Sequence, residues 1–328
     1  RSMRNAIAWS HDLLDARAQL AFERLAVFIG GFTLDAAAAV IDEDDPLAVI
    51  DTLVANSLLT MSETVDGSAR YTMLEPIREY GLEQLAAGDD ETTARDRHAT
   101  YFLEVAEWSD WAFFMEPSEG GPRLARLGTE TANIRAALGW LRQRGEHVAL
   151  LRMAGSLASL WIPIGHPREG QDWIEPALDA CLDIPNAVRA KALAVLSWCV
   201  NTAGEPERAR TLAEESLAIW RTLDDPLGLV QALILSGVPA YRTADHQGAE
   251  ARLTEALDVL SRLDEPDWVL HARATVTCEL GHVAMRQGDV IRAERLFRAI
   301  REDEVSRGFE IGESHIYGTV TLFGLADI

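Results

Sequence analysis

Apolar and small residues recur with a long period between about Leu157 and Ile300. Each of four segments carries a small residue, a second one twelve positions later and, in three of the four, a third after seven more. The first residues of the series are Ala158, Ser197, Gly237 and Gly281, which stand 39, 40 and 44 residues apart. This period predicts stacked pairs of helices, because one pair alone cannot bury its apolar face. We expect an α-helical solenoid whose small residues let paired helices approach closely.

The first 88 residues follow a different pattern. Helical spacing of apolar residues, with Asp15, Thr33 and Pro46 at helix starts, predicts helices over 3–14, 15–29, 33–40 and 46–56. Two short apolar runs, 57–61 and 70–74, flank a turn sequence at 65–68, and a helix over 76–85 follows. Helices followed by a two-stranded hairpin predict a winged helix.

The fold expected for the whole chain is therefore mainly all-α. We expect a winged-helix domain with a small β-hairpin over residues 1–88, and a helical connector or degenerate first repeat over 89–156. Tetratricopeptide-like repeats follow over 157–328. Since 316–328 repeats the first-helix pattern without a second helix, we expect the repeats to be truncated at the carboxyl end.

Charge weighs against nucleic acid as a partner. The net charge is −22, and residues 1–90 carry six arginines against sixteen acidic side chains. The expected recognition helix, 46–56, has no basic residue and carries Asp51, whereas a DNA reader needs Lys or Arg around that helix. An anionic membrane is disfavoured in the same way. With no long apolar run and no signal peptide, we expect a cytoplasmic protein.

Motifs for catalysis or metal binding are missing from the sequence. Cys181, Cys199 and Cys278 are too scattered for a disulfide framework or a zinc site. There is no phosphate-binding loop, and Lys191 is the only lysine. We expect no catalytic residue, no metal site and no cofactor in this chain, which is then not an enzyme by itself.

Four blocks in the amino-terminal part carry a family resemblance. They are Ala8–Leu14, Phe22–Phe32, Leu53–Leu59 and Tyr71–Tyr80. In this order they resemble the segment that directly follows the nucleotide-binding domain in bacterial signal-transduction ATPases with numerous domains, in their LuxR-type and AfsR-type transcriptional regulator branches. Glu130–Trp140 resembles the block before the repeats in that family. The resemblance implies that the chain is the carboxyl-terminal portion of such a regulator, with ATP or ADP bound by an upstream domain.

The same resemblance implies a contact between the winged helix and the upstream NTPase domain. Candidate contact residues are Leu74, Glu75, Arg78 and Glu79. Leu74 stands where many family members have a histidine that touches ADP, and leucine cannot hydrogen-bond a phosphate. An ordinary solvated helix face explains Arg78 and Glu79 equally well.

A tetratricopeptide-like stack implies a concave groove lined by the first helix of each pair. The candidate groove residues are Lys191, Trp198, Asn201, Gln231, Tyr241, His282 and Met285. Such a mixture suits a protein, peptide or small-molecule effector. Alternatively, Trp198 and Tyr241 are core residues between repeats. Outside the groove, Asn133 is expected to satisfy backbone groups at a helix corner.

Together these features predict the sensory and protein-interaction region of an ATPase that regulates transcription. The repeats would bind an effector or partner, and the winged helix would relay this to the NTPase domain. Two alternatives stay open: a free-standing scaffold that holds protein partners, and a DNA-binding winged helix with a dimerising tail.

Overall fold

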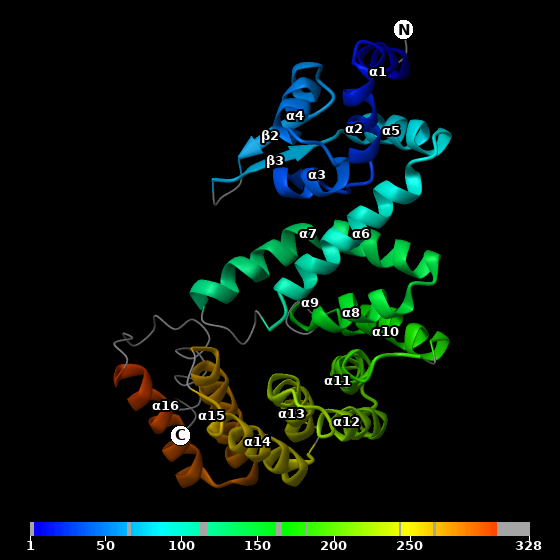
Figure 1. Ribbon diagram of the computed structural model, residues 1–328. Coiled ribbons are helices and arrows are strands. Elements are labelled where there is room, and N and C mark those ends of the chain that lie inside the picture. Colours follow the sequence, from blue (N-terminus) through cyan, green and yellow to red (C-terminus); the bar gives the residue numbers. More distant parts are fainter. Residues whose placement is uncertain are drawn as a thin grey trace. The chain divides into compact units, whose positions relative to one another are not determined.

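The computed structural model describes residues 3–63, 67–111, 117–161, 166–181, 183–242, 244–264 and 267–306. The chain divides into two compact units (Figure 1). We call Arg1–Val105 with Thr129–Glu146 the winged-helix unit, and Ala106–Gly128 with His147–Ile328 the repeat unit. Two helices, α6 (Glu91–Trp108) and α7 (Pro117–Arg144), contribute residues to both units. A winged-helix domain and a helical solenoid-like body confirm the predicted fold class.

The winged-helix unit places short helices around a small antiparallel sheet. Its elements are α1 (Met3–Asp12), α2 (Ala16–Leu25), β1 (Phe32–Thr33), α3 (Leu34–Ile41), α4 (Pro46–Ala55), β2 (Thr60–Glu63), β3 (Ala69–Thr72) and α5 (Glu75–Ala87). The strand order is β1-β3-β2, with Tyr71 opposite both Phe32 and Met61. The two-residue strand β1 has no periodicity to reveal it in the sequence. Residues 65 and 66 of the predicted wing turn, 65–68, lie outside the described residues.

The predicted helix starts of this unit are confirmed by their caps. The side chains of Asp15, Thr33 and Asp45 accept hydrogen bonds from backbone amides at the starts of α2, α3 and α4. Pro46 occupies the first turn of α4, where its missing N–H leaves no internal bond unmade.

The first wing strand begins later than the predicted run 57–61. Ser57 adopts a left-handed conformation with φ of 58°, and the Leu58 amide donates to the carbonyl of Leu53 at 3.0 Å. This is a helix-terminating hydrogen-bond pattern, so residues 57 and 58 complete the end of α4. Leu58 and Leu59 are buried, and the exposed strand β2 starts only at Thr60.

A close backbone approach explains the second glycine of the Gly30–Gly31 pair. Gly31 has φ of +92°, and a Cβ atom there would lie 2.7 Å from the carbonyl oxygen of Tyr71. Only glycine combines this conformation with this contact. Gly31 thereby lets the chain turn from α2 into β1 directly against β3.

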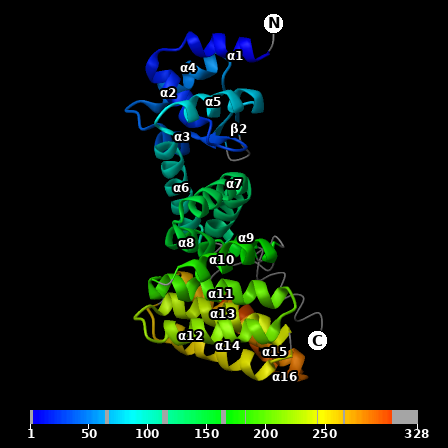
Figure 2. The same cartoon turned by 90° about the vertical axis from the view of Figure 1, so that its right-hand side faces the viewer.

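The repeat unit consists of antiparallel helix pairs. Its helices are α8 (His147–Ser156), α9 (Ala158–Trp161), α10 (Pro167–Ala180), α11 (Asn186–Thr202), α12 (Pro206–Trp220), α13 (Pro226–Arg242), α14 (His246–Ser261), α15 (Asp267–Gln287) and α16 (Val290–Ser306). Figure 2 shows α11 to α16 stacked one pair upon the next, as the contacts between neighbouring helices require. The predicted helix over 316–328 lies outside the described residues.

Small residues stand where the helices of a pair approach most closely. A Cβ atom on Gly281 of α15 would lie 2.5 Å from the Phe297 ring of α16, and one on Gly237 of α13 would lie 3.1 Å from Leu253 of α14. In α12 the small residue of the repeat series is Ser216, whose buried hydroxyl donates to the carbonyl of Ala190 of α11 at 2.7 Å. The close approach predicted from the repeat is thus confirmed.

Among the residues that the structure describes, no helix combines the length and apolar character that crossing a membrane requires.

Candidate functional site

The predicted groove residues lie on the first helices of three successive pairs. Lys191, Trp198 and Asn201 belong to α11, Gln231 and Tyr241 to α13, and His282 and Met285 to α15. The side chain of Tyr241 lies outside the described part of the structure. Of the remaining six, Lys191 and Gln231 share one local environment, Asn201 lies in a second, and His282 and Met285 lie in a third.

Lys191 and Gln231 meet at a carboxylate that the sequence analysis did not single out. The Lys191 Nζ atom donates to Asp110 Oδ2 at 2.6 Å and to Ser156 Oγ at 2.9 Å. Gln231 Nε2 lies 3.5 Å from the same Asp110 oxygen. Burial raises the pKa of the Asp110 carboxyl, and the charge of Lys191 opposes that shift. Asp110 follows the end of α6 and belongs, like its partners, to the repeat unit.

A small cavity adjoins this ion pair. Its volume is about 20 Å³, and its wall includes Trp111, Gly155, Ala194 and Trp220 in addition to Asp110 and Lys191. Apart from Asp110, Lys191, Gln231 and Ser159, the residues of the wall are apolar. Sequence reasoning missed Asp110 because it lies 81 positions from Lys191 and carries no motif.

Asn201 lines a larger cavity of about 130 Å³. Arg252 of α14 lies in its wall and is only 8% exposed. Its Nη2 atom donates to Glu214 at 2.6 Å, and its Nη1 atom lies 3.7 Å from Asp245. Opposite charges therefore balance around this cavity, which gives it no strong preference for a ligand of one sign.

Pro239 also contributes to the wall of the larger cavity. Proline has no N–H, so α13 lacks the helical hydrogen bond to the carbonyl of Leu235, another wall residue.

His282 and Met285 belong mainly to the packing of the last helix pair. His282 Nδ1 lies 3.5 Å from Glu279 Oε2, and its ring centroid lies 5.5 Å from that of Phe297. Met285 packs against the core cluster that contains Phe297. Trp198 on α11 is half-buried. His282 and Met285 therefore contribute to the packing of the last helix pair.

The predicted interdomain residues surround the start of α5. Leu74 precedes the helix and is 58% exposed. Arg78 Nη2 donates to Glu75 Oε1 at 2.7 Å, and this hydrogen bond lowers the pKa of Glu75. Arg78 also reaches the carbonyl of Ala26 at 3.4 Å, whereas Glu79 is exposed. The guanidinium is therefore already engaged, and Leu74 offers the largest free apolar surface of the four residues.

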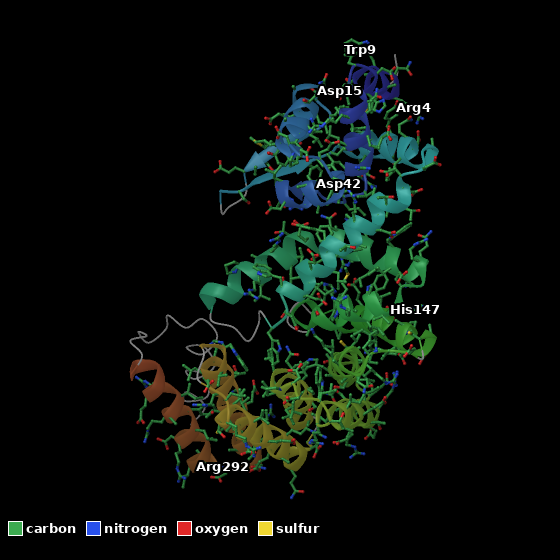
Figure 3. The ribbon with its side chains drawn as sticks, in the orientation of Figure 1. Arg4, Trp9, Asp15, Asp42, His147 and Arg292 are labelled. Atoms are coloured by element: carbon green, nitrogen blue, oxygen red, sulfur yellow. The ribbon has the colours of Figure 1, made fainter. Side chains whose placement is uncertain are left out.

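Exposed apolar side chains also mark α1. Trp9 projects outward from this helix (Figure 3) and is 66% exposed. Leu13, one helical turn later, is 58% exposed. The exposed side of α4 carries Leu47, Asp51 and Thr52. Among the described residues of α4 there is no basic side chain to meet a phosphate.

A buried polar network joins the second part of α7 to the turn at Ile29–Gly31 and to strand β3. Asn133 accepts from the amide of Ile29 at 2.7 Å and donates to the carbonyl of Gly31 at 2.9 Å. Its neighbour Glu130 forms an ion pair with Arg70 of β3 at 2.6 Å. The expectation that Asn133 satisfies backbone groups is confirmed, and these residues of α7 belong to the winged-helix unit.

His98 of α6 is enclosed by aromatic rings. Its centroid lies 5.1 Å from that of Phe28 and 4.7 Å from that of Phe102. Burial lowers the pKa of His98 to about 4, so the imidazole is neutral at pH 7. The part of the chain that the structure describes holds no group of three or more side chains suited to a metal ion.

The chain is similar to a known domain family and to several known proteins. Residues 14–86 match the winged helix-turn-helix domain family. Over 300 residues the chain is 33% identical to putative HTH-type transcriptional regulators of Mycobacterium bovis and Mycobacterium tuberculosis, covering 86% of this chain and 33% of each relative. The chain thus spans about a third of the length of these relatives.

A solved structure shares the fold. It is a signal transduction ATPase with numerous domains from Pyrococcus horikoshii, described as having a tetratricopeptide repeat sensor. The TM-score is 0.54 at 11% identity, covering 100% of this chain and 50% of that one. The chain therefore contains a winged helix-turn-helix domain, resembles putative transcriptional regulators over most of its length, and shares its architecture with a repeat-containing signalling ATPase.

Proposed function

We propose that this chain is the sensory and protein-interaction region of a signal-transduction ATPase that regulates transcription. The repeat unit binds an effector or partner protein, and the winged-helix unit relays the event to an NTPase domain of the same polypeptide. ATP or ADP binds in that domain, while this chain supplies no catalytic group and no cofactor site. The similarity to putative transcriptional regulators and the shared fold of the signalling ATPase support this proposal.

The observation that carries the proposal is the course of α6 and α7. Both helices have residues in each unit. In the winged-helix unit, α6 contributes the enclosed His98 and α7 contributes Asn133. In the repeat unit, Glu107 of α6 binds Arg152 of α8 at 2.8 Å, and Asp110 binds Lys191. Because α6 and α7 continue from one unit into the other, a rearrangement of the repeats can shift the equilibrium between two states of the winged-helix unit.

Leu74 is the residue through which the relay is best tested. In the off state, we expect the exposed Leu74 and the residues Glu75, Arg78 and Glu79 to contact the NTPase domain and to limit ATP turnover. A carboxylate at position 74 has to be desolvated in an apolar contact, which is costly. We expect Leu74→Asp, introduced into the complete polypeptide, to raise basal ATP turnover several-fold.

Leu47→Asp is the matched control. Leu47 is also exposed, at 46%, but lies on α4. We expect Leu47→Asp to leave the basal ATP turnover unchanged. Equal rates for the parent protein, Leu74→Asp and Leu47→Asp would contradict the proposal. A reading frame without an upstream phosphate-binding loop would instead leave the scaffold alternative.

A further inference from the structure

The surroundings of Lys191 are built to receive a carboxylate. Two side-chain donors converge there, the ammonium of Lys191 and the amide of Gln231, and the ammonium also donates to the hydroxyl of Ser156. The rest of the wall is apolar or small, with Trp220 as its largest member. An ammonium and an amide donor in an apolar wall favour an anionic acceptor, and a carboxylate accepts both through its two oxygens.

The chain fills this place with its own Asp110, held in an unusual backbone conformation. Trp111, the next residue, has φ of 62°, in the left-handed region that a bulky side chain rarely adopts. Such a conformation persists only where the surroundings impose it. The segment Ser109–Trp111 follows the end of α6, where the Asp110 amide donates to the carbonyl of Glu107 at 3.2 Å. Asp110 contacts Lys191 of α11 and Gln231 of α13, and Trp111 lines the adjoining cavity.

We propose that the inner face of α11 and α13 around Lys191 is a binding site for an acidic peptide, one that presents an aspartate beside an aromatic residue. In the described structure the chain's own Ser109–Trp111 occupies the site. The occupant itself identifies the ligand class, because its carboxylate meets Lys191 and its indole lines the adjoining cavity. This inference rests on the proposed function, since it states where the effector binds and what chemistry it carries.

Displacement of Ser109–Trp111 by a peptide would change how α6 contacts the repeat helices. Asp110 stands two residues beyond α6, whose earlier part, to Val105, belongs to the winged-helix unit. A peptide that takes the place of Asp110 removes one of the ion pairs by which this part of the chain contacts the repeat helices, another being Glu107–Arg152. Binding at Lys191 thus weakens the attachment of the end of α6.

The test uses the full 328-residue chain and a fluorescent peptide with the sequence of residues 104–111, Glu-Val-Ala-Glu-Trp-Ser-Asp-Trp. Asp110→Asn weakens the internal occupant, so the peptide binds this variant at least tenfold more tightly than the parent chain. Adding Lys191→Met to Asp110→Asn abolishes binding. The double variant removes both charges of the pair, which avoids leaving one buried charge unpaired.

Arg189→Met combined with Asp110→Asn is the matched control, because it removes a cation from the same helix that pairs with Glu215. It keeps the affinity for the peptide. A peptide with asparagine in place of its aspartate next to the last tryptophan does not bind. Circular dichroism verifies equal helix content in all variants.

A second readout uses the fact that Lys191 is the only lysine. Acetylation followed by mass spectrometry finds Lys191 protected in the parent chain, reactive in Asp110→Asn, and protected again when the peptide is added. Equal peptide affinity for the parent and Asp110→Asn, or affinity that survives Lys191→Met, overturns the inference. Protection of Lys191 by millimolar benzoate but not by the peptide also overturns it, in favour of a small organic acid.

These outcomes are separate from those of the relay. A response of ATP turnover to Leu74→Asp without peptide binding at Lys191 contradicts only the ligand site. Peptide binding at Lys191 without any response to Leu74→Asp contradicts the relay.

Discussion

His98 shows how enclosure changes the chemistry of one side chain. It is 3% exposed and lies among Phe28 and Phe102, and burial lowers its pKa to about 4. An unfolded chain has histidine pKa values of about 6.5. Between these two values the unfolded state binds a proton that the folded state does not. The folded state therefore loses stability as the pH falls from 6.5 towards 4.

We expect this difference to be measurable by replacing the side chain with one that does not titrate. Between pH 7 and pH 5, the free energy of unfolding of the parent chain should fall by about 2 kcal/mol more than that of His98→Leu. Urea unfolding of the two proteins, followed by circular dichroism, measures the difference. Parallel pH profiles for both would contradict a neutral, enclosed imidazole.

Several buried polar residues have partners that are distant in the sequence. Asn133 and Gly31 are separated by 102 positions and meet in one hydrogen bond. The sequence predicted that Asn133 serves backbone groups, but not which ones. It gave no indication of the ion pair between Arg70 and Glu130, because both residues are ordinary members of charged, amphipathic segments.

At the scale of elements, the packing of paired helices depends on the small residues of the repeat. The position of Gly281 on α15 faces the buried ring of Phe297 on α16. A methyl group there must displace a ring that has no free space, and overpacking of this kind costs about 1–3 kcal/mol. The repeat period in the sequence located this position because the same spatial demand recurs in each pair.

We expect Gly281→Ala to destabilise the chain by about 2 kcal/mol. Gly139→Ala is the matched control, since Gly139 lies within α7 and a Cβ atom there would meet nothing within 4 Å. That variant should be neutral or stabilising by up to about 1 kcal/mol, because alanine favours helix. Thermal unfolding of both variants tests the difference, and a loss of stability equal in the two would refute the packing argument.

Element boundaries were predicted best where a cap or a proline marks them. Asp15, Thr33 and Pro46 mark helix starts by local hydrogen bonding and by ring geometry. The start of β2 was predicted too early, because Leu58 and Leu59 are apolar for a different reason: they are buried at the end of α4. An apolar run alone does not distinguish a strand from a buried helix end.

For the whole molecule, charge decides the expected behaviour towards nucleic acid. The net charge is −22, and the described residues of α4 include no cation on its exposed side. Binding to duplex DNA gains most of its free energy from neutralised phosphates. A winged helix whose α4 carries no cation has the architecture of a DNA reader but lacks basic side chains to neutralise phosphates at that helix.

We therefore expect the chain to leave duplex DNA unretarded in gel shifts at 50 mM salt, with affinity weaker than the ~10⁻⁴ M limit of non-specific binding. Replacing Asp51 and Thr52 on the exposed side of α4 by lysine should introduce weak, salt-sensitive retention. Salt-dependent binding by the parent chain would instead support the DNA-binding alternative.

The sequence by itself determined the class of fold, the repeat period, the order of the winged-helix elements other than β1, and the starts of α2, α3 and α4. These features follow from spacing, capping and turn chemistry, which act over a few residues and leave a readable pattern. The tertiary structure alone decided that Lys191 and Gln231 face Asp110 and that Asn133 holds the turn at Gly31. Such contacts join residues 81 to 121 positions apart, and they depend on how complete elements pack rather than on any local pattern.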